Sequence, residues 1–211
     1  MITSFLGIDI EYDETALRPR AETELLARTA LAKAQLLAAD GHALRAIDVC
    51  CGTGNVACAL AVKSPNLAIV ATDLTDGCVA WARKNALRLA LANRVAVVQG
   101  DLFINVPPGP YDLITCNPPY ISTGKLEGRE DLKNEPREAF DGGPYGVTIH
   151  QRVAREALPL LRAGGWLCFE FGLGQEKQLE LVIKRAGGYD TVEFSNDENG
   201  APRVVAVRKA S

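Results

Sequence analysis

The sequence predicts an α/β domain of the doubly wound type, with a mostly parallel sheet of seven strands and an antiparallel hairpin at its C-terminal end. Three observations lead to this prediction. From residue 44 onward, short apolar segments alternate with segments of helical periodicity. A glycine-rich turn joins the first apolar segment to the helix that follows it. The last two strand-like segments have no helix between them, which is typical of a hairpin added to a parallel sheet.

The first half of the chain is expected to supply the strands of the parallel sheet. Residues 1–20 carry little regular pattern. Residues 21–39 are rich in Ala, Leu, Lys and Glu and predict a helix that ends near Asp40-Gly41. Strands are then expected at 44–50, 67–72, 94–98 and 111–116. A helix is expected at 56–63, and apolar residues at helical spacing predict another helix over 79–91.

The second half begins with a long polar segment. Residues 121–145 are full of Gly, Pro and charge, and a loop of this length in a compact domain is usually functional or disordered. An apolar face at 150–161 predicts a helix, interrupted late by Pro159 and closed by Gly164-Gly165. A strand at 166–171, a helix at 179–186 and two strands at 189–194 and 203–207 complete the expected order.

Length and composition limit the possible classes of protein. The 211 residues are 47% hydrophobic and 23% charged, which is ordinary for a globular chain and wrong for a disordered one. We expect one domain over residues 1–211, with an N-terminal extension and helix at 1–43 and a catalytic core at 44–211. A net charge of −3 argues against nonspecific binding to nucleic acid or to an anionic membrane. No apolar stretch approaches the length of a membrane span and no signal peptide is present, so we expect a cytoplasmic protein without membrane contact.

The six cysteines do not indicate a metal site. None of them forms a Cys-x-x-Cys pair, and the chain has only two histidines. Reduced and mostly buried thiols are the expectation. The sequence therefore predicts no bound metal.

The turn between the first strand and the first helix of the core predicts a cofactor site. The segment 48–55 reads Asp-Val-Cys-Cys-Gly-Thr-Gly-Asn, and its glycines allow a tight turn and close approach of a ligand to the backbone. The predicted binding residues of this turn are Asp48, Cys50, Gly52, Gly54 and Asn55. The same spacing fits a dinucleotide fingerprint, with Asp73 about 20 residues further on, so an oxidoreductase stays open at this point.

Two further acids favour a methyl donor over a dinucleotide. Asp73, followed by Leu74, ends the second strand of the core and is suited to bind ribose hydroxyls. Asp101, followed by Leu102, ends the third strand and can accept a hydrogen bond from an adenine amino group. Together with Asp48, these acids suit the sulfonium cation of S-adenosylmethionine better than a pyrophosphate. The alternative without a binding function is a glycine-rich turn that holds no ligand.

The segment Asn117-Pro118-Pro119-Tyr120 predicts the acceptor half of the site. The Asn117 side-chain oxygen and the Pro118 carbonyl can accept hydrogen bonds from a planar NH2 group, which fixes that group and stabilises positive charge developing on its nitrogen. Pro119 stiffens the turn, and Tyr120 offers a face on which a planar target can pack. We therefore predict an N-methyltransferase, with a Pro-rich turn capped by Asn as the alternative without chemistry.

The chain resembles the glutamine amide methyltransferases of the HemK/PrmC type. The resemblance runs from about Arg18 to Arg208, and it rests on the segments 18–26, 48–55, 117–121, 135–143 and 165–175 together with Asp73 and Asp101. It implies a Rossmann-like class I methyltransferase fold that uses S-adenosylmethionine. It also implies that Glu22 and Thr23 lie over the methionine end of the cofactor, that Asn117 binds the target amide and also contacts the cofactor, and that Glu135 belongs to the substrate loop.

The resemblance implies a protein glutamine, as in peptide-chain release factors, as the first substrate. Bacterial members of the family usually carry a helical domain before the catalytic one, and residues 1–43 are too few for it. The sequence therefore leaves open an accessory protein, or a small molecule or peptide intermediate as the methyl acceptor. A nucleic-acid amino-methyltransferase is disfavoured by the charge, and a catalytically silent cofactor-binding module is a further alternative.

Overall fold

The computed structural model describes residues 1–38, 41, 43–127, 129 and 136–211. Within this part of the chain, seven strands form the main sheet in the order β5-β4-β3-β6-β7-β9-β8. The strands from β5 to β7 run parallel, and β9 runs antiparallel to both β7 and β8. The predicted α/β class, with a parallel sheet and a C-terminal antiparallel hairpin, is confirmed.

The elements follow the expected order. The strands of the main sheet are β3 (Leu44–Val49), β4 (Leu67–Asp73), β5 (Val95–Gln99), β6 (Tyr111–Cys116), β7 (Leu161–Glu170), β8 (Tyr189–Asn196) and β9 (Pro202–Lys209). The helices are η1 (Ala21–Thr23), α1 (Glu24–Ala38), α2 (Asn55–Lys63), α3 (Asp76–Arg88), α4 (Thr123–Leu126), η3 (Arg137–Ala139), α5 (Thr148–Glu156) and α6 (Glu176–Ala186).

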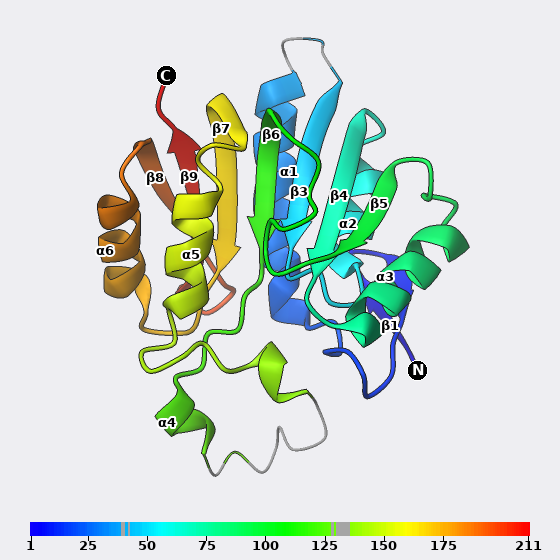
Figure 1. Cartoon of the computed structure of the whole chain (residues 1–211), viewed down its shortest axis with the longest axis horizontal. Helices are drawn as coiled ribbons and strands as arrows, with labels where there is room; N and C mark the ends of the chain where they lie inside the picture. Colours follow the sequence, from blue (N-terminus) through cyan, green and yellow to red (C-terminus); the bar gives the residue numbers. More distant parts are fainter. Residues whose placement is uncertain (39–40, 42, 128, 130–135) are drawn as a thin grey trace.

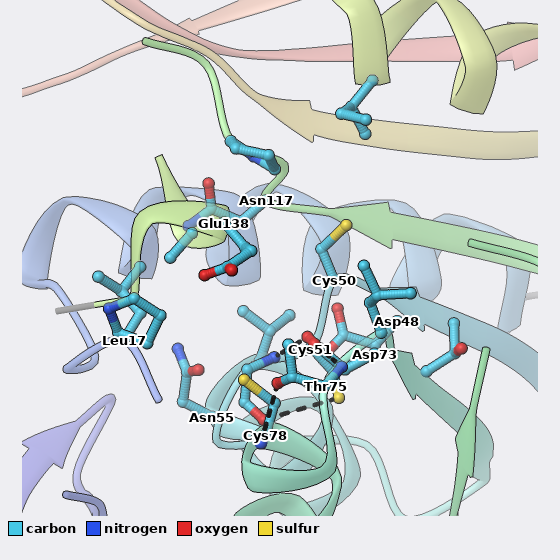
Figure 2. A pocket seen from close by; sticks show the side chains of 18 of the residues that line it. Leu17, Asp48, Cys50, Cys51, Asn55, Asp73, Thr75, Cys78, Asn117 and Glu138 are labelled. Carbon is cyan, nitrogen blue, oxygen red and sulfur yellow. Dashed lines mark hydrogen bonds between the residues drawn. The ribbon is translucent and has the colours of Figure 1, made fainter. Parts of the chain in front are cut away.

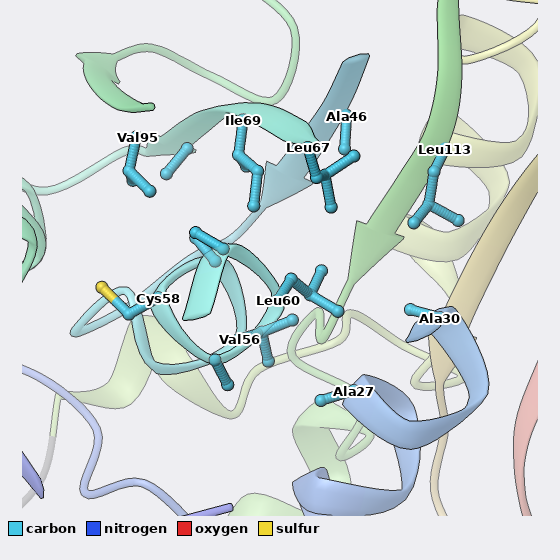
Figure 3. Close-up of a cluster of buried hydrophobic side chains, with 14 of the residues drawn as sticks. Ala27, Ala30, Ala46, Val56, Cys58, Leu60, Leu67, Ile69, Val95 and Leu113 are labelled. Atoms are coloured by element: carbon cyan, nitrogen blue, oxygen red, sulfur yellow. The ribbon is translucent and has the colours of Figure 1, made fainter. Parts of the chain in front are cut away.

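Helices cover both faces of the main sheet (Figure 1). Helices α1 and α2 lie on one face and α5 and α6 on the other. Figure 3 shows the first of these packing layers, where small and branched side chains of α1 and α2, such as Ala27, Ala30 and Leu60, meet the strand residues Ile69 and Leu113. Because both faces of the sheet are buried, the central strands are nearly continuous apolar segments. This is why their positions could be predicted well from the sequence.

The predicted helix at 150–161 is too long. Helix α5 ends at Glu156, and Leu161 is already the first residue of β7. Proline cannot donate the backbone hydrogen bond that would continue the helix through Pro159. The two glycines expected to close the helix lie instead inside β7, where the pairing with β6 shifts register between Tyr111 and Leu113. Gly164 has a φ of +73°, a conformation that suits this irregularity.

The prediction that residues 1–20 lack a regular pattern is wrong. Strands β1 (Ile2–Phe5) and β2 (Ile8–Glu11) form an antiparallel hairpin. Its two-residue turn, Leu6 and Gly7, has φ values of +48° and +80°, as a tight hairpin of this length requires. The signal was the alternation of Ile8 and Ile10 with acidic residues directly after a glycine.

A buried asparagine ties this hairpin to the main domain. Asn85 of α3 is fully buried; its Oδ1 accepts from the backbone N–H of Glu11 at 2.9 Å. Its Nδ2 donates to the carbonyls of Glu11 and Thr53 at 2.8 and 3.0 Å. Because Thr53 lies in the glycine-rich turn, Asn85 connects three segments that are far apart in the sequence.

The carboxyl ends of the parallel strands meet at one edge of the sheet (Figure 1). The chain first adds strands on one side of β3 and then returns to place β6 on the other side, so the strand order reverses at β3 and β6. Sheets of this type bind ligands outside such a reversal. The segment expected as a loop at 121–145 lies beyond this edge and contains α4 and η3 in its described part.

No helix in the described part of the chain is both long enough and apolar enough to cross a membrane.

Candidate active site

A cavity of about 360 Å³ lies at the carboxyl ends of β3, β4 and β6, and is called the first cavity here. Figure 2 shows Asn117 and Glu138 on one side of it and Asn55, Cys51 and Asp73 on the other. Ten of the twelve residues predicted to bind the cofactor line this cavity: Thr23, Asp48, Cys50, Gly52, Asn55, Asp73, Leu74, Asp101, Leu102 and Asn117. The two exceptions are Glu22 and Gly54. These ten residues come from five separate segments of the chain, which the structure brings together.

The backbone of the glycine-rich turn shapes the floor of the first cavity. Cys50, Gly52 and Gly54 have φ values of +55°, +53° and +76°. At Gly54, a Cβ atom would lie 3.1 Å from the Cβ of Ala82 in α3. Gly54 does not line the cavity itself, but its missing side chain allows α3 to pack closely against the start of α2.

Asp73 is held by backbone donors at the rim of this turn. Its Oδ2 accepts from the N–H of Gly52 at 2.8 Å, and its Oδ1 accepts from the N–H of Thr75 at 3.3 Å. Burial raises the pKa of Asp73, and the hydrogen bond from Gly52 opposes that rise. The carboxyl group is thus fixed in place while it still faces the cavity.

Asp48 is the most deeply buried acid of the first cavity, with 1% of its surface exposed. Its Oδ1 accepts from the hydroxyl of Thr115 at 2.7 Å, and its Oδ2 accepts from the N–H of Ala57 at 3.0 Å. Burial raises the pKa of Asp48 to about 7. Since Thr115 is on β6 and Ala57 is in the first turn of α2, Asp48 joins the two strands of the sheet reversal to the helix above them.

Asp101 lines the first cavity as expected, but it also has a partner that the sequence did not reveal. Nη1 of Arg152, on α5, lies 2.9 Å from Oδ1 and 3.0 Å from Oδ2 of Asp101. A carboxylate has about four acceptor positions, so this ion pair leaves some of them for a ligand. Asp101 and Arg152 are 51 residues apart in the sequence, with β6, α4 and η3 between them, which is why the pairing could not be read from a local pattern.

A second cavity of about 710 Å³ adjoins the first, and is called the second cavity here. Of the described residues, four line both cavities: Leu17, Arg20, Asn117 and Ala139. The second cavity is also lined by Glu22, Pro118 and Tyr120, whereas Pro119 faces the first. Glu22 was expected at the cofactor, and the structure places it on the other side of Asn117. The predicted substrate residue Glu135 lies outside the described residues.

Asn117 lies at the junction of the two cavities. Its Nδ2 donates to the hydroxyl oxygen of Thr23 at 3.1 Å. The amide oxygen of Asn117 is thereby directed away from Thr23 and remains available as an acceptor. An acceptor at this position can bind an NH2 group that approaches from the second cavity.

Glu170 is a buried acid next to Tyr120 that was not predicted from the sequence as a site residue. The Tyr120 hydroxyl donates to Oε1 of Glu170 at 3.3 Å, and Nη2 of Arg203 donates to the same hydroxyl at 3.3 Å. Glu170 has 1% of its surface exposed, and burial raises its pKa to about 7. Its place at the carboxyl end of the strand expected at 166–171 was the available signal.

Comparison with known proteins decides the family. The family model described as Methyltransferase small domain matches residues 23–132. A protein named release factor glutamine methyltransferase from Geobacter sulfurreducens is 35% identical over 206 residues, which is 97% of this chain and 69% of the relative. The chain belongs to the release factor glutamine methyltransferase family. It is a methyltransferase, and the oxidoreductase alternative for its glycine-rich turn no longer holds.

Solved structures share the fold of this methyltransferase. A methyltransferase from Pyrococcus furiosus has a TM-score of 0.65 at 24% identity and covers 97% of this chain and 90% of its own. The N-terminal domain of human METTL16, in complex with SAH, has a TM-score of 0.67 at 19% identity and covers 96% and 76%. At these identities the comparison concerns the fold alone.

Within the described residues, no group of three or more His, Cys, Asp or Glu side chains is arranged to hold a metal ion.

Proposed function

We propose that this methyltransferase binds S-adenosylmethionine in the first cavity and methylates the side-chain amide nitrogen of a glutamine that enters the second. The observation that carries the proposal is the position of Asn117, which lines both cavities and whose amide oxygen accepts no hydrogen bond from the described residues. A methyl donor and a methyl acceptor must approach each other within bonding distance, and Asn117 marks where the two cavities allow it.

The first cavity suits a cationic ligand without phosphate groups. Among the residues that the structure describes, five carboxyl side chains line it, against two basic side chains; the acids are Asp48, Asp73, Asp101, Glu138 and Asp141, and the bases are Arg18 and Arg20. The hydroxyl oxygen of Thr72 is buried in its wall and has no hydrogen-bond partner in the described part of the chain, so a polar ligand atom could satisfy it. When bound, S-adenosylmethionine supplies a methyl group that is already activated for transfer.

The residues of the acceptor side hold the amide rather than activate it by a strong base. Asn117 Oδ1 and the Pro118 carbonyl would accept from the two N–H groups of the target amide. These contacts fix its plane and stabilise the positive charge that develops on nitrogen. Held in this way, the target nitrogen would take the methyl group that S-adenosylmethionine gives up and would then lose one proton to water. His150 takes no part in this, because burial lowers its pKa to about 4 and it lies packed against Phe169.

A protein is the acceptor that the second cavity favours. Its walls carry charges of both signs, among them Glu22, Lys125 and Arg203. Two large apolar side chains at the same cavity are strongly exposed, Tyr145 at 76% and Leu173 at 64%, as is typical of surfaces that bind a partner. The relatives of this chain are named as release factor glutamine methyltransferases, which points to a release factor as that partner.

Methyl transfer into a purified, unmethylated release factor tests the proposal. The chain is incubated with S-adenosylmethionine labelled in the methyl group, and the modified residue is located by mass spectrometry. We expect label in the factor on one glutamine and none in a factor in which that glutamine is replaced by alanine. A parallel reaction with a small-molecule extract serves as the competitor. Label in the extract and none in the release factor would contradict the protein substrate but not the methyltransferase chemistry.

Calorimetry tests the cofactor separately. We expect saturable binding of S-adenosylmethionine and no binding of NAD or NADP. Binding of a dinucleotide in preference to S-adenosylmethionine would reject the assignment of the first cavity.

A further inference from the structure

The two ends of the segment 121–145 lie against each other beside the second cavity. Tyr120 directly precedes this segment and Gly146 directly follows it, and these two residues are called the base of the segment here. A Cβ atom on Gly146 would overlap the carbonyl oxygen of Tyr120, so the two backbones approach as closely as a glycine allows. What holds the base together therefore decides where the described part of the segment lies.

The side chain of Gln175 bonds to both residues of the base. Its Nε2 donates to the carbonyl of Tyr120 at 2.9 Å and to the carbonyl of Gly146 at 3.3 Å. Its Oε1 accepts from the backbone N–H of Gly172 at 2.8 Å, in the turn between β7 and α6. An amide NH2 group has two protons, so it can serve two carbonyls at once. Gln175 thus joins the base of the segment to the carboxyl end of the central sheet.

The partners of Gln175 fix the direction of its amide group. The two carbonyls can only accept, and the N–H of Gly172 can only donate. A reversed amide would place its oxygen against two carbonyl oxygens and its NH2 group against an N–H. A carboxylate of the same shape would make only the bond with Gly172. All three bonds together therefore require a glutamine.

Gln175 is also the residue at which α6 begins, but its side chain does not serve that helix. Its backbone carbonyl accepts from the N–H of Leu179 at 2.9 Å, as the first bond of the helix. In the described part of the chain, its side chain makes no capping hydrogen bond to α6. The short side chains of Ser, Thr, Asp and Asn are the usual caps at this position. The hydrogen bonds of the side chain therefore serve the base of the segment and the turn before the helix.

The segment that Gln175 holds contributes walls to both cavities. Among its described residues, Lys125, Phe140 and Tyr145 line the second cavity, and Glu138 and Asp141 line the first.

Tyr120 is fixed at both ends. Its carbonyl accepts from Gln175, and its hydroxyl donates to Glu170 and accepts from Arg203, both at 3.3 Å. Because Asn117 is only three residues away across two prolines, a shift of the Tyr120 backbone would be passed on to Asn117.

We propose that Gln175 is a positioning residue whose side-chain NH2 group closes the base of the segment 121–145 and so holds the turn from Asn117 to Tyr120 in the geometry that methyl transfer requires. The inference rests on the proposed function for the nature of the methyl acceptor. The hydrogen bonds of Gln175 belong to the free enzyme, so they can be tested without any acceptor.

The acceptor-independent test measures hydrogen exchange of single backbone amides by NMR. The N–H groups of Ile121 and Gly142 donate to carbonyls across the segment next to its base, at 2.9 and 2.8 Å. Gln175→Met keeps the length of the side chain without its amide, and we expect both protons to exchange about tenfold faster in this variant. The N–H of Gly52, in the glycine-rich turn, should keep its rate. Unchanged exchange at Ile121 and Gly142, or equal acceleration at Gly52, overturns the proposal.

The kinetic test compares two replacements of Gln175. We expect turnover to fall about tenfold in Gln175→Met and in Gln175→Glu, with the dissociation constant of S-adenosylmethionine within about threefold of the wild type. Gln175→Glu is the sharper variant, because its ionised carboxylate still accepts from Gly172 but cannot donate to the base. Gln151→Met, at an exposed position of α5, is the matched control and should be unchanged. Turnover at the wild-type level in Gln175→Glu, or a loss of cofactor binding as large as the loss of turnover, overturns the positioning role.

A change on the other side of the same contact gives independent evidence. Gly146→Ala places a Cβ atom against the Tyr120 carbonyl and 2.7 Å from Nε2 of Gln175. Gly200→Ala adds a side chain at a similar φ, +80° against +71°, and meets no neighbour, so it is the matched control. We expect Gly146→Ala to lower turnover about as much as Gln175→Met, and the double variant to be no slower than either. Losses that multiply in the double variant contradict a shared role.

The tests separate the possible failures. If the Gln175 variants do not fold, the comparison of Gly146→Ala with Gly200→Ala decides. If the wild type transfers no methyl group to a release factor, the proposed function fails, and the exchange rates still decide whether Gln175 holds the base of the segment.

Discussion

The two cavities that meet at Asn117 are built in different ways. The first is shaped by backbone: a turn with three left-handed residues, and acids such as Asp73 that are fixed by backbone N–H groups. The second is larger, at about 710 Å³ against about 360 Å³, and is walled by side chains from the segment after β6 and from the ends of β7 and β9. Backbone geometry leaves a recognisable sequence pattern, whereas a wall of side chains does not. The cofactor is therefore easier to infer than the molecule that is methylated.

The largest effect is expected at Asn117, one of the residues that line both cavities, where methyl transfer and cofactor binding should respond differently. Asn117→Ala removes the acceptor for the target amide, and we expect turnover to fall by about 10²–10³-fold, as for the loss of one stabilising hydrogen bond in the transition state. The dissociation constant of S-adenosylmethionine, measured by calorimetry, should change by less than about threefold, because the first cavity keeps its other walls. Asn199→Ala in the exposed turn before β9 is the control. Equal losses of binding and turnover would show that Asn117 belongs to the cofactor cavity only.

At Asp73 we expect the opposite result, with cofactor binding affected more than turnover. Asp73→Ala removes a carboxylate from the first cavity and leaves the N–H of Gly52 without its acceptor. We expect the dissociation constant of S-adenosylmethionine to rise about 10–100-fold, with a smaller change in turnover at saturating cofactor. Asp190→Ala, an exposed partner of Arg208, is the matched control and should bind normally. An unaltered dissociation constant in Asp73→Ala would remove this residue from the binding site.

The stability of the folded protein should depend on pH through Asp48, which lines the first cavity. Burial raises its folded-state pKa from the ordinary 3.8 to about 7, so the protonated form stabilises the fold. That stabilisation is complete below the unfolded pKa and is lost as the pH rises through about 7. Asp48→Asn cannot ionise, so between pH 5 and 8 we expect the free energy of unfolding of the wild type to fall by about 2 kcal/mol relative to the variant. Urea denaturation at both pH values measures this. Glu170 titrates in both the wild type and Asp48→Asn. If the free energy of unfolding of the two proteins falls equally with pH, groups other than Asp48 cause the fall.

The smallest effect should come from the packing behind the glycine-rich turn. Gly54→Ala and Gly200→Ala place a side chain at similar φ values, +76° and +80°, but only the first meets a neighbour, the Cβ of Ala82 at 3.1 Å. We expect Gly54→Ala to lower the free energy of unfolding by about 1 kcal/mol more than Gly200→Ala does, because the backbone strain is common to both. Thermal unfolding gives the comparison. Equal destabilisation would show that α3 yields to the added methyl group.

The sequence predicted the parts of the molecule that depend on local pattern. The strands of the buried sheet appear as apolar runs, and the acids Asp48, Asp73 and Asp101 follow from their places at or near the ends of those runs. The hairpin of residues 2–11 was missed because its strands are short and polar residues interrupt them. The N-terminal turn of β7 was misread because glycines that interrupt a strand resemble those that end a helix.

The contacts that the sequence did not predict join positions that are far apart in the chain. Arg152 pairs with Asp101, Thr23 with Asn117, and Glu170 with Tyr120, and each pair joins segments separated by 50 residues or more. No periodicity connects such positions, since only the topology of the sheet brings them together. The place of Glu170 at a strand end could have flagged it, but its partners could not be derived.

The contacts of Asn85 have a consequence for the order in which the chain folds. This single side chain bonds to Glu11, 74 residues earlier, and to the carbonyl of Thr53. Contacts between such distant positions form late, because the chain must first lose the entropy of closing a long loop. We therefore expect the glycine-rich turn to reach its final form only after the sheet has assembled and the N-terminal hairpin has docked. In a refolding experiment, the recovery of cofactor binding should then lag behind the recovery of helical and strand structure.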